Sequence, residues 1–231
     1  MEQIKEVPVI RYRDGLSRLS EDRVVREYEF TLSFNGAVVE RGTCLATQLE
    51  EMARGFLLTE GYVACPGDIR AISLGEGRIE TWGEAPSSPP LLGRVGSALW
   101  TPEQVVDLAA RFLHTSELFR ATGSVHSALL AVEGQEYYAE DLGRHNAIDK
   151  VVGMAAAAGA PLARSILYTS GRLPVGMARK AVRAGIPAVV SRSAPTDLTL
   201  DLARETGLTV IGFAREGRMN LYAPLEGAGA C

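Results

Sequence analysis

The sequence predicts an α/β protein, in which a small β-rich N-terminal domain precedes a three-layer C-terminal domain. From Gly123 onward, short apolar runs alternate with helical patterns, which is typical of a sheet with helices on both faces. The first 45 or so residues instead show polar and apolar residues in alternation. Residues 83–101 lie between these regions and are rich in Pro, Gly and Ser, which favours a linker. We therefore place the two domains at residues 1–100 and 101–231.

The N-terminal region begins with strands. Glu27 to Phe34 alternates between polar and apolar residues, and Asn35-Gly36 is a strong signal for a hairpin turn. The return strand starts at Ala37, and residues 68–82 are expected to form two more short strands.

One helix is expected in this region, from Thr47 to about Thr59. Thr47 and Glu50 have the spacing of a capping box, and Gly61 provides a stop.

The C-terminal region is expected to form a mainly parallel sheet with helices between its strands. Its first helix runs from Pro102 to His114, with Thr101 as N-cap and Pro102 at the first helical position. Further helices are expected at 144–158, 174–184 and 196–206, and strands at 125–132, 136–139, 165–169, 187–190, 209–213 and 219–222.

Composition limits the classes of function. The 231 residues are 46% hydrophobic and 23% charged, as in ordinary globular proteins. A net charge of -4 provides no global basic field for nucleic acid. No apolar run is long enough to span a membrane, and the first residues lack the apolar core of a signal peptide. We therefore expect a cytoplasmic protein that binds neither nucleic acid nor membrane.

Polar residues cluster in the loops that follow the predicted strands. In open α/β sheets, ligands bind beyond the carboxyl ends of the strands, where helices begin. Four such loops each carry arginine together with glycine or hydroxyl groups. They contribute Asp141, Arg144, His145 and Asn146; Ser170, Gly171 and Arg172; Arg192 and Ser193; and Phe213, Ala214, Arg215, Glu216, Gly217 and Arg218.

This combination indicates an anionic ligand with more than one phosphate. Glycine allows close approach of backbone N–H groups, helix N-termini favour anions, and guanidinium groups match phosphate with paired hydrogen bonds. Turns and helix caps would explain any single loop equally well, but four loops together favour a binding site.

Two histidines are each compatible with two roles. Asp149 lies four residues after His145, so a carboxylate on the same helix face would orient the imidazole for acid–base work. Capping and ion pairing explain the same residues. His126 starts a strand after a Thr-Gly-Ser turn, where a structural role and a place in the site both remain open.

Several segments resemble the FdhD family of formate dehydrogenase accessory sulfurtransferases. The segments are TGSVHSALL (122–130), EDLGRHNAIDKVVG (140–153), TSGRLP (169–174), KAVRAGIPAVVSRSAPTDL (180–198), GFAREGRMNLY (212–222) and CLATQLEEMARGFLLTEGYV (44–63). Together they extend over nearly the whole chain.

The resemblance implies a cytidine-deaminase-like C-terminal domain and a homodimer. It also implies binding of a molybdenum bis(pterin guanine dinucleotide) cofactor, with Phe213 to Arg218 as the matching stretch, and a guanine nucleotide that fits part of that site. Sulfur would come from a cysteine desulfurase, through a persulfide on a CxxC loop, before the cofactor enters formate dehydrogenase.

The sequence departs from the family where the CxxC loop is expected, because residues 91–100 contain no cysteine. Cys44 is expected to be buried, which leaves Cys65 and Cys231 as weak candidates for the sulfur-carrying residue, with an inert thiol favoured for each. Three functions therefore remain. The first is a sulfur carrier that uses an atypical cysteine, and the second is a chaperone that holds the cofactor without covalent chemistry. The third is a regulator that responds to guanine nucleotides, which would not be a P-loop NTPase because the GxxxxGK[ST] motif is missing. No zinc or other metal site is expected, because the H-x-E and P-C-x-x-C pattern of zinc deaminases is missing.

Overall fold

The computed structural model describes residues 3–88, 91–98 and 100–224, except for the side chains of residues 113 and 114. The N-terminal elements are β1 (Ile4–Arg13), β2 (Leu16–Val25), β3 (Tyr28–Phe34), β4 (Ala37–Cys44), α1 (Leu49–Glu60), β5 (Ile69–Gly75) and β6 (Arg78–Gly83). The C-terminal elements are α2 (Pro102–Thr115), α3 (Glu117–Thr122), β7 (His126–Val132), β8 (Gln135–Asp141), α4 (Arg144–Ala157), β9 (Ile166–Thr169), α5 (Val175–Arg183), β10 (Ala188–Ser191), α6 (Asp197–Thr206), β11 (Thr209–Arg215) and β12 (Arg218–Ala223).

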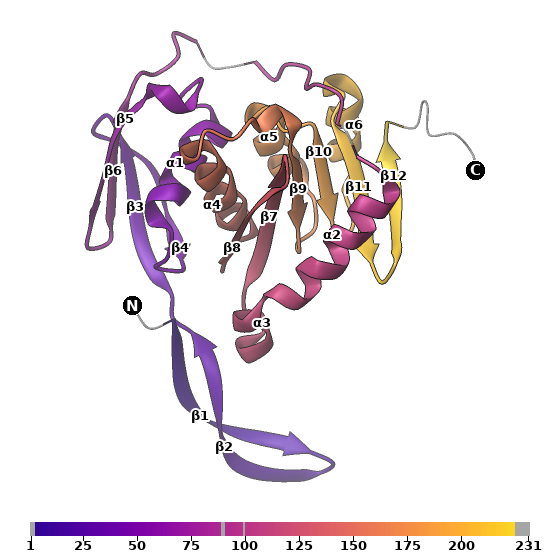
Figure 1. The fold of residues 1–231 in the computed structure, drawn as a ribbon. Helices are drawn as coiled ribbons and strands as arrows, with labels where there is room; N and C mark the ends of the chain where they lie inside the picture. The colour runs from indigo at the N-terminus through magenta and orange to yellow at the C-terminus, as the bar shows by residue number, and fades with distance from the viewer. Residues whose placement is uncertain (1–2, 89–90, 99, 225–231) are drawn as a thin grey trace.

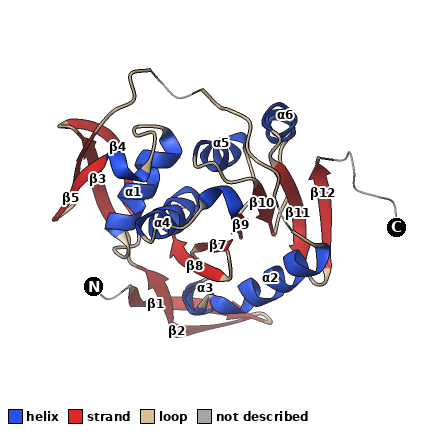
Figure 2. Ribbon diagram, turned by 45° about the horizontal axis from the view of Figure 1, so that its top comes forward, coloured by secondary structure: helices blue, strands red, loops and turns tan. Residues whose placement is uncertain are grey.

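The predicted α/β class is confirmed, with helices on both faces of a six-stranded sheet. Figure 2 shows α4, α5 and α6 on one face and α2 on the other. Buried residues of α2, among them Val105 and Phe112, pack against Tyr168 and Ile211 of the sheet. This apolar contact fixes α2 beside the strand ends that carry the predicted site.

The expectation of a mainly parallel sheet is wrong. The strand order is β12-β11-β10-β9-β7-β8, and only the β9–β10 and β10–β11 pairs are parallel. Tight hairpins, with Gly134 between β7 and β8 and Gly217 between β11 and β12, add an antiparallel strand at each edge, and β7 itself runs antiparallel to β9. The turn at Gly134 was expected, but apolar periodicity reports burial and not strand direction, so it did not predict that β7 runs antiparallel to β9.

Helix α1 connects the N-terminal region to the C-terminal sheet. Its residues Met52 and Ala53 pack on the four-stranded sheet β4-β3-β6-β5, while Leu57 and Leu58 belong to the large core around α4 and α5. In Figure 2, α1 lies between that small sheet and α4. The division at residue 100 stays a prediction, and the apolar core extends across it.

The first two strands form a separate arm. They pair over ten residues each in their own two-stranded sheet, which extends away from the rest of the fold (Figure 1). Near its end Ile10, Tyr12, Leu16 and Leu19 are exposed. Within the described residues, no helix is long and apolar enough to cross a membrane.

Candidate functional site

The ends of β9, β10 and β11 meet at one edge of the large sheet, beside the start of β7. Arg192 N donates to Thr169 O (3.0 Å), and Ser170 N donates to Ser127 O of β7 (3.0 Å). Phe213 N donates to Ser193 O (3.1 Å), which joins the end of β11 to the same edge. The structure thus brings together three of the four loops that the sequence singled out.

The fourth loop reaches this edge through Arg144, the first residue of α4. Its side chain packs over Gly171, where an added β-carbon would lie 2.9 Å from Arg144 Cδ. Ser191 Oγ donates to Gly171 O (2.7 Å) and accepts from Ser193 N (2.9 Å), which stabilises the loops after β9 and β10. A side chain at position 171 would therefore have to displace that of Arg144.

The β11–β12 turn contributes two further arginines. Arg215 and Arg218 pair across it, while Glu216 and Gly217 take the positive φ angles of 53° and 74° that a two-residue hairpin requires. The Arg215 guanidinium lies 6.0 Å from the Phe213 ring centroid.

The positive charges of Arg192 and Arg215 both act on the buried hydroxyl of Tyr168. That hydroxyl donates to Ala214 O (2.5 Å). Burial raises the pKa of Tyr168, and the charges of Arg192 and Arg215 partly oppose that rise. Arginines from two loops, the one after β10 and the one after β11, therefore act on the same buried group.

The site arginines differ from most other arginines because they lack acidic partners. In the part of the chain that the structure describes, five of them form no ion pair and no side-chain hydrogen bond: Arg144, Arg172, Arg192, Arg215 and Arg218. The Nε atoms of Arg144, Arg192 and Arg215 are also buried without a partner. Buried polar groups normally have partners, so this edge has donors available for an anion.

A pocket of about 380 Å³ adjoins these arginines. Phe119 of α3, His126 of β7, Ser170 and Arg192 line it. His126 Nδ1 lies 3.3 Å from Ser170 Oγ. The pocket has a volume typical of small-molecule sites and places His126 inside the candidate site.

Asp141 does not line this crevice, which corrects the expectation for that residue. Its side chain is fully buried, with Oδ2 2.7 Å from Lys150 Nζ and accepting from Leu45 N. Its Oδ1 accepts from Asn146 Nδ2 (2.9 Å), which also donates to Thr43 O (3.0 Å). The side chains of Asp141 and Asn146 thus hold the start of α4 against the end of β4.

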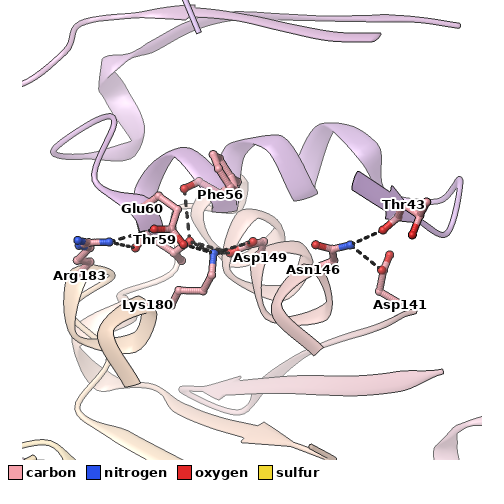
Figure 3. Close-up of polar contacts among 9 residues, drawn as sticks. All are labelled: Thr43, Phe56, Thr59, Glu60, Asp141, Asn146, Asp149, Lys180 and Arg183. Carbon is pink, nitrogen blue, oxygen red and sulfur yellow. Dashed lines mark hydrogen bonds and ion pairs between the residues drawn. The ribbon is translucent and has the colours of Figure 1, made fainter. Parts of the chain in front are cut away.

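The suggestion that Asp149 orients His145 is also wrong. Both oxygens of the buried Asp149 carboxylate lie 2.9 Å from Lys180 Nζ, and Oδ1 also accepts from Thr59 Oγ1. Figure 3 shows Lys180 between Asp149 of α4 and Thr59 and Glu60 of α1. Burial alone would lower the pKa of Lys180, but Asp149 and Glu60 raise it above its usual range. His145 is left exposed near the start of α4.

Comparison with known proteins assigns the chain to a family. A model of the FdhD/NarQ family matches residues 87–227. The chain belongs to the FdhD/NarQ family. Sulfur carrier protein FdhD of Methanothermobacter thermautotrophicus is 34% identical over 98% of this chain and 99% of its own length. The Streptomyces coelicolor protein of the same name is 35% identical, over 93% of this chain and 92% of its own.

A solved structure supports the fold over nearly the whole chain. It is a chain from Desulfotalea psychrophila described as a formate dehydrogenase accessory protein. It superimposes with a TM-score of 0.86 at 30% identity, and the match covers 97% of this chain and 99% of that one. The resemblance to the FdhD family is therefore confirmed.

The cysteines fall into three different situations. Cys44 is buried as expected, and burial first, then the nearby Asp141, raises its thiol pKa to about 12, which keeps it protonated and unreactive. Cys65 is exposed. Cys231, the other candidate for carrying sulfur, lies outside the described residues.

The sequence missed one element of the site, the helix α3. It spans six residues, too few to show a helical period, and it supplies Phe119 to the pocket. The only available signal was Ser116, whose hydroxyl accepts from Phe119 N as a typical N-cap (2.9 Å).

Proposed function

We propose that this chain binds a molybdenum-pterin guanine dinucleotide at the arginine-lined edge of the large sheet and serves formate dehydrogenase as an accessory protein. The observation that carries the proposal is the set of five arginines without acidic partners, among the residues described, around the ends of β9, β10 and β11. The names of its relatives, sulfur carrier protein FdhD and formate dehydrogenase accessory protein, support the same role.

The chemistry of the edge suits a ligand with several phosphates. Arginine forks form paired, charge-assisted hydrogen bonds with phosphate oxygens, and the energy of such bonds exceeds that of neutral ones. The protein as a whole carries a charge of -4, so the attraction for an anion at this edge is local and does not come from the overall charge. A local cationic site on an acidic protein favours a defined small anion over nucleic acid.

Sulfur transfer is the second part of the proposal. A cysteine desulfurase would supply sulfur as a persulfide, and the exposed Cys65 would accept it. In that exchange the Cys65 thiolate attacks the terminal sulfur, a new S–S bond forms, and the desulfurase thiolate leaves. We propose a homodimer as the working state, as the resemblance implies.

A second candidate function is a cofactor-binding chaperone without sulfur transfer. It is favoured by the lack of cysteine in residues 91–100, where the family's CxxC loop is expected. Whole-protein mass spectrometry after incubation with a desulfurase and cysteine distinguishes the two. A gain of one sulfur atom that disappears in Cys65→Ser supports the carrier. No gain, with nucleotide binding intact, supports the chaperone.

Binding is tested by titration calorimetry with GDP as the probe. Wild-type protein is expected to bind, and Arg192→Ala and Arg215→Ala are each expected to weaken binding by about 1.5–3 kcal/mol, the range for hydrogen bonds to charged groups. Arg204→Ala is the matched control, because Arg204 pairs with Asp201 on the surface of α6. No GDP binding by the wild type, or equal losses in all three variants, contradicts the proposal.

A further inference from the structure

Ser170 lies where its hydroxyl can set the tautomer of His126. Its Oγ accepts from Ser127 N (3.0 Å) and lies 3.3 Å from His126 Nδ1. The hydroxyl therefore has its own hydrogen left to donate, and His126 Nδ1 is the acceptor within reach. This arrangement satisfies all three atoms when Nδ1 is unprotonated and the ring carries its hydrogen on Nε2.

The imidazole is also held neutral. Burial lowers the pKa of His126, and the positive charge of Arg144 lowers it further. A neutral ring with Nδ1 occupied offers a single donor, Nε2–H. No residue in the described part of the chain forms a hydrogen bond with Nε2.

The serine hydroxyls around the same pocket are already engaged. Ser124 Oγ donates to Thr122 O (3.0 Å), and Ser116 Oγ bonds to the Glu140 carboxylate. The Tyr138 hydroxyl donates to Glu140 Oε1 (2.9 Å), so the Ser127 hydroxyl, 3.2 Å from the Tyr138 oxygen, donates to Tyr138. The neutral donor left for a ligand in this pocket is therefore the Nε2–H of His126.

The pocket also offers an apolar face to a flat ring. Phe119 lines it and is 46% exposed, so its ring is accessible from the pocket side. Leu142 and Val125 line the same pocket. Aromatic side chains of this kind stack on bases of any sequence, because every base has a π face.

We propose that this pocket holds the base of the nucleotide and that His126 donates from Nε2 to the ring carbonyl oxygen. The inference rests on the proposed function and adds the residue that selects the base. A 6-oxopurine presents an acceptor at that position, whereas adenine presents an amino donor. His126 Nε2–H and the amino group of adenine are both donors, so neither finds an acceptor when they face each other. The site therefore discriminates against adenine nucleotides.

The discrimination is tested by calorimetry on the full chain with GDP, IDP and ADP. IDP keeps the 6-oxo group and lacks the 2-amino group of guanine, so it isolates the contact with His126. His126→Leu is expected to weaken GDP and IDP binding about tenfold and to leave ADP binding unchanged. His126→Gln, whose amide also donates, is expected to retain most of the preference.

Phe119→Ala serves as the contrasting variant. Loss of stacking weakens all three nucleotides by similar factors, because stacking does not read the ring carbonyl. An unchanged ratio of GDP to ADP affinity in His126→Leu overturns the proposal while leaving GDP binding, and hence the proposed function, intact. Failure of the wild type to bind GDP overturns both.

The tautomer is measured without any ligand. The chain has three histidines, so ¹⁵N NMR spectra of the rings are simple to assign with His126→Gln as reference. At neutral pH the proton of His126 is expected on Nε2, and Ser170→Ala is expected to release the ring into a mixture of tautomers. A proton on Nδ1, or a charged ring at neutral pH, overturns the proposal.

Discussion

The side chain of Arg144 packs directly over Gly171, at a distance that leaves no room for a β-carbon on the glycine. Arg144 opens α4, and Gly171 follows β9, so the contact joins two of the loops at the candidate site. The guanidinium is therefore placed by packing and not by an acidic partner. A cation positioned in this way stays available to a bound anion.

Gly171→Ala is expected to shift Arg144 and weaken GDP binding by about 1 kcal/mol, roughly fivefold. The added methyl would lie 2.9 Å from Cδ and 3.2 Å from Cβ of Arg144, so the whole side chain must move. Titration calorimetry measures the effect. Gly176→Ala is the control, because its nearest neighbour would be His145 Nε2 at 4.0 Å. Equal GDP affinities for both variants would show that Arg144 does not contribute to GDP binding.

Gly55→Ala is expected to destabilise the protein by about 1–3 kcal/mol or more, since overpacking forces backbones apart. A β-carbon at Gly55 of α1 would lie 1.8 Å from the carbonyl oxygen of Asp149 in α4, and one at Gly153 would lie 1.8 Å from Glu51 O. Urea denaturation measures the loss, again with Gly176→Ala for comparison. Unchanged stability would mean that α1 and α4 do not cross so closely.

Lys150→Met is expected to cost about 3–5 kcal/mol of unfolding free energy, because it leaves the Asp141 carboxylate buried without its counter-charge. The two side chains are fully buried and 2.7 Å apart. Denaturant titrations of the single variant and of Asp141→Asn/Lys150→Met test this, and the double variant is expected to recover part of the loss. The exposed pair of Arg204 and Asp201 provides the contrast, with less than about 1 kcal/mol lost in Arg204→Met.

Stability is expected to fall as the pH drops below about 6.5. Burial, and then Arg144, lowers the pKa of His126 in the folded state. In the unfolded chain His126 therefore takes up a proton at its usual pKa, whereas in the folded chain it takes up the proton only at lower pH. The stabilisation that His126 contributes is complete above the usual pKa and is lost as the pH falls toward the pKa of the folded state. Denaturation from pH 7 to pH 5 measures the slope, and His126→Gln should flatten it. If the slope of stability against pH is the same in His126→Gln, the pH dependence does not come from His126.

Local signals in the sequence predicted local structure well. Thr101 caps α2 as expected, with its hydroxyl accepting from Gln104 N (3.3 Å) and Gln104 Oε1 accepting in return (2.9 Å). Asn35 and Gly36 form the predicted turn, with φ angles of 50° and 83°. Both patterns are complete within four residues, and no distant contact overrides them here.

Distant partners account for the errors. The capping box predicted at Thr47 and Glu50 does not form, because α1 starts after Gln48, and the Thr47 hydroxyl accepts from Lys150 of α4 (3.4 Å). Asp149 likewise turns to Lys180 on another helix. Sequence spacing identifies neighbours along one helix, whereas both of these partners come from helices packed across it.

The positions of the candidate site residues could be predicted where they depend on topology and could not be predicted where they depend on packing. Loops after neighbouring strands must meet at one edge, which placed Ser170, Arg192 and Arg215 together. The burial of Asp141 and the contribution of Phe119 follow from how α3 and α4 pack, which no residue pattern reveals.

The most direct test of the central claim is a crystal structure of the chain grown with GDP. We predict that the diphosphate lies within hydrogen-bond distance of Arg192 and Arg215, with the base in the pocket beside His126 and Phe119. Nucleotide bound elsewhere, with these arginines still unpartnered, would contradict the account.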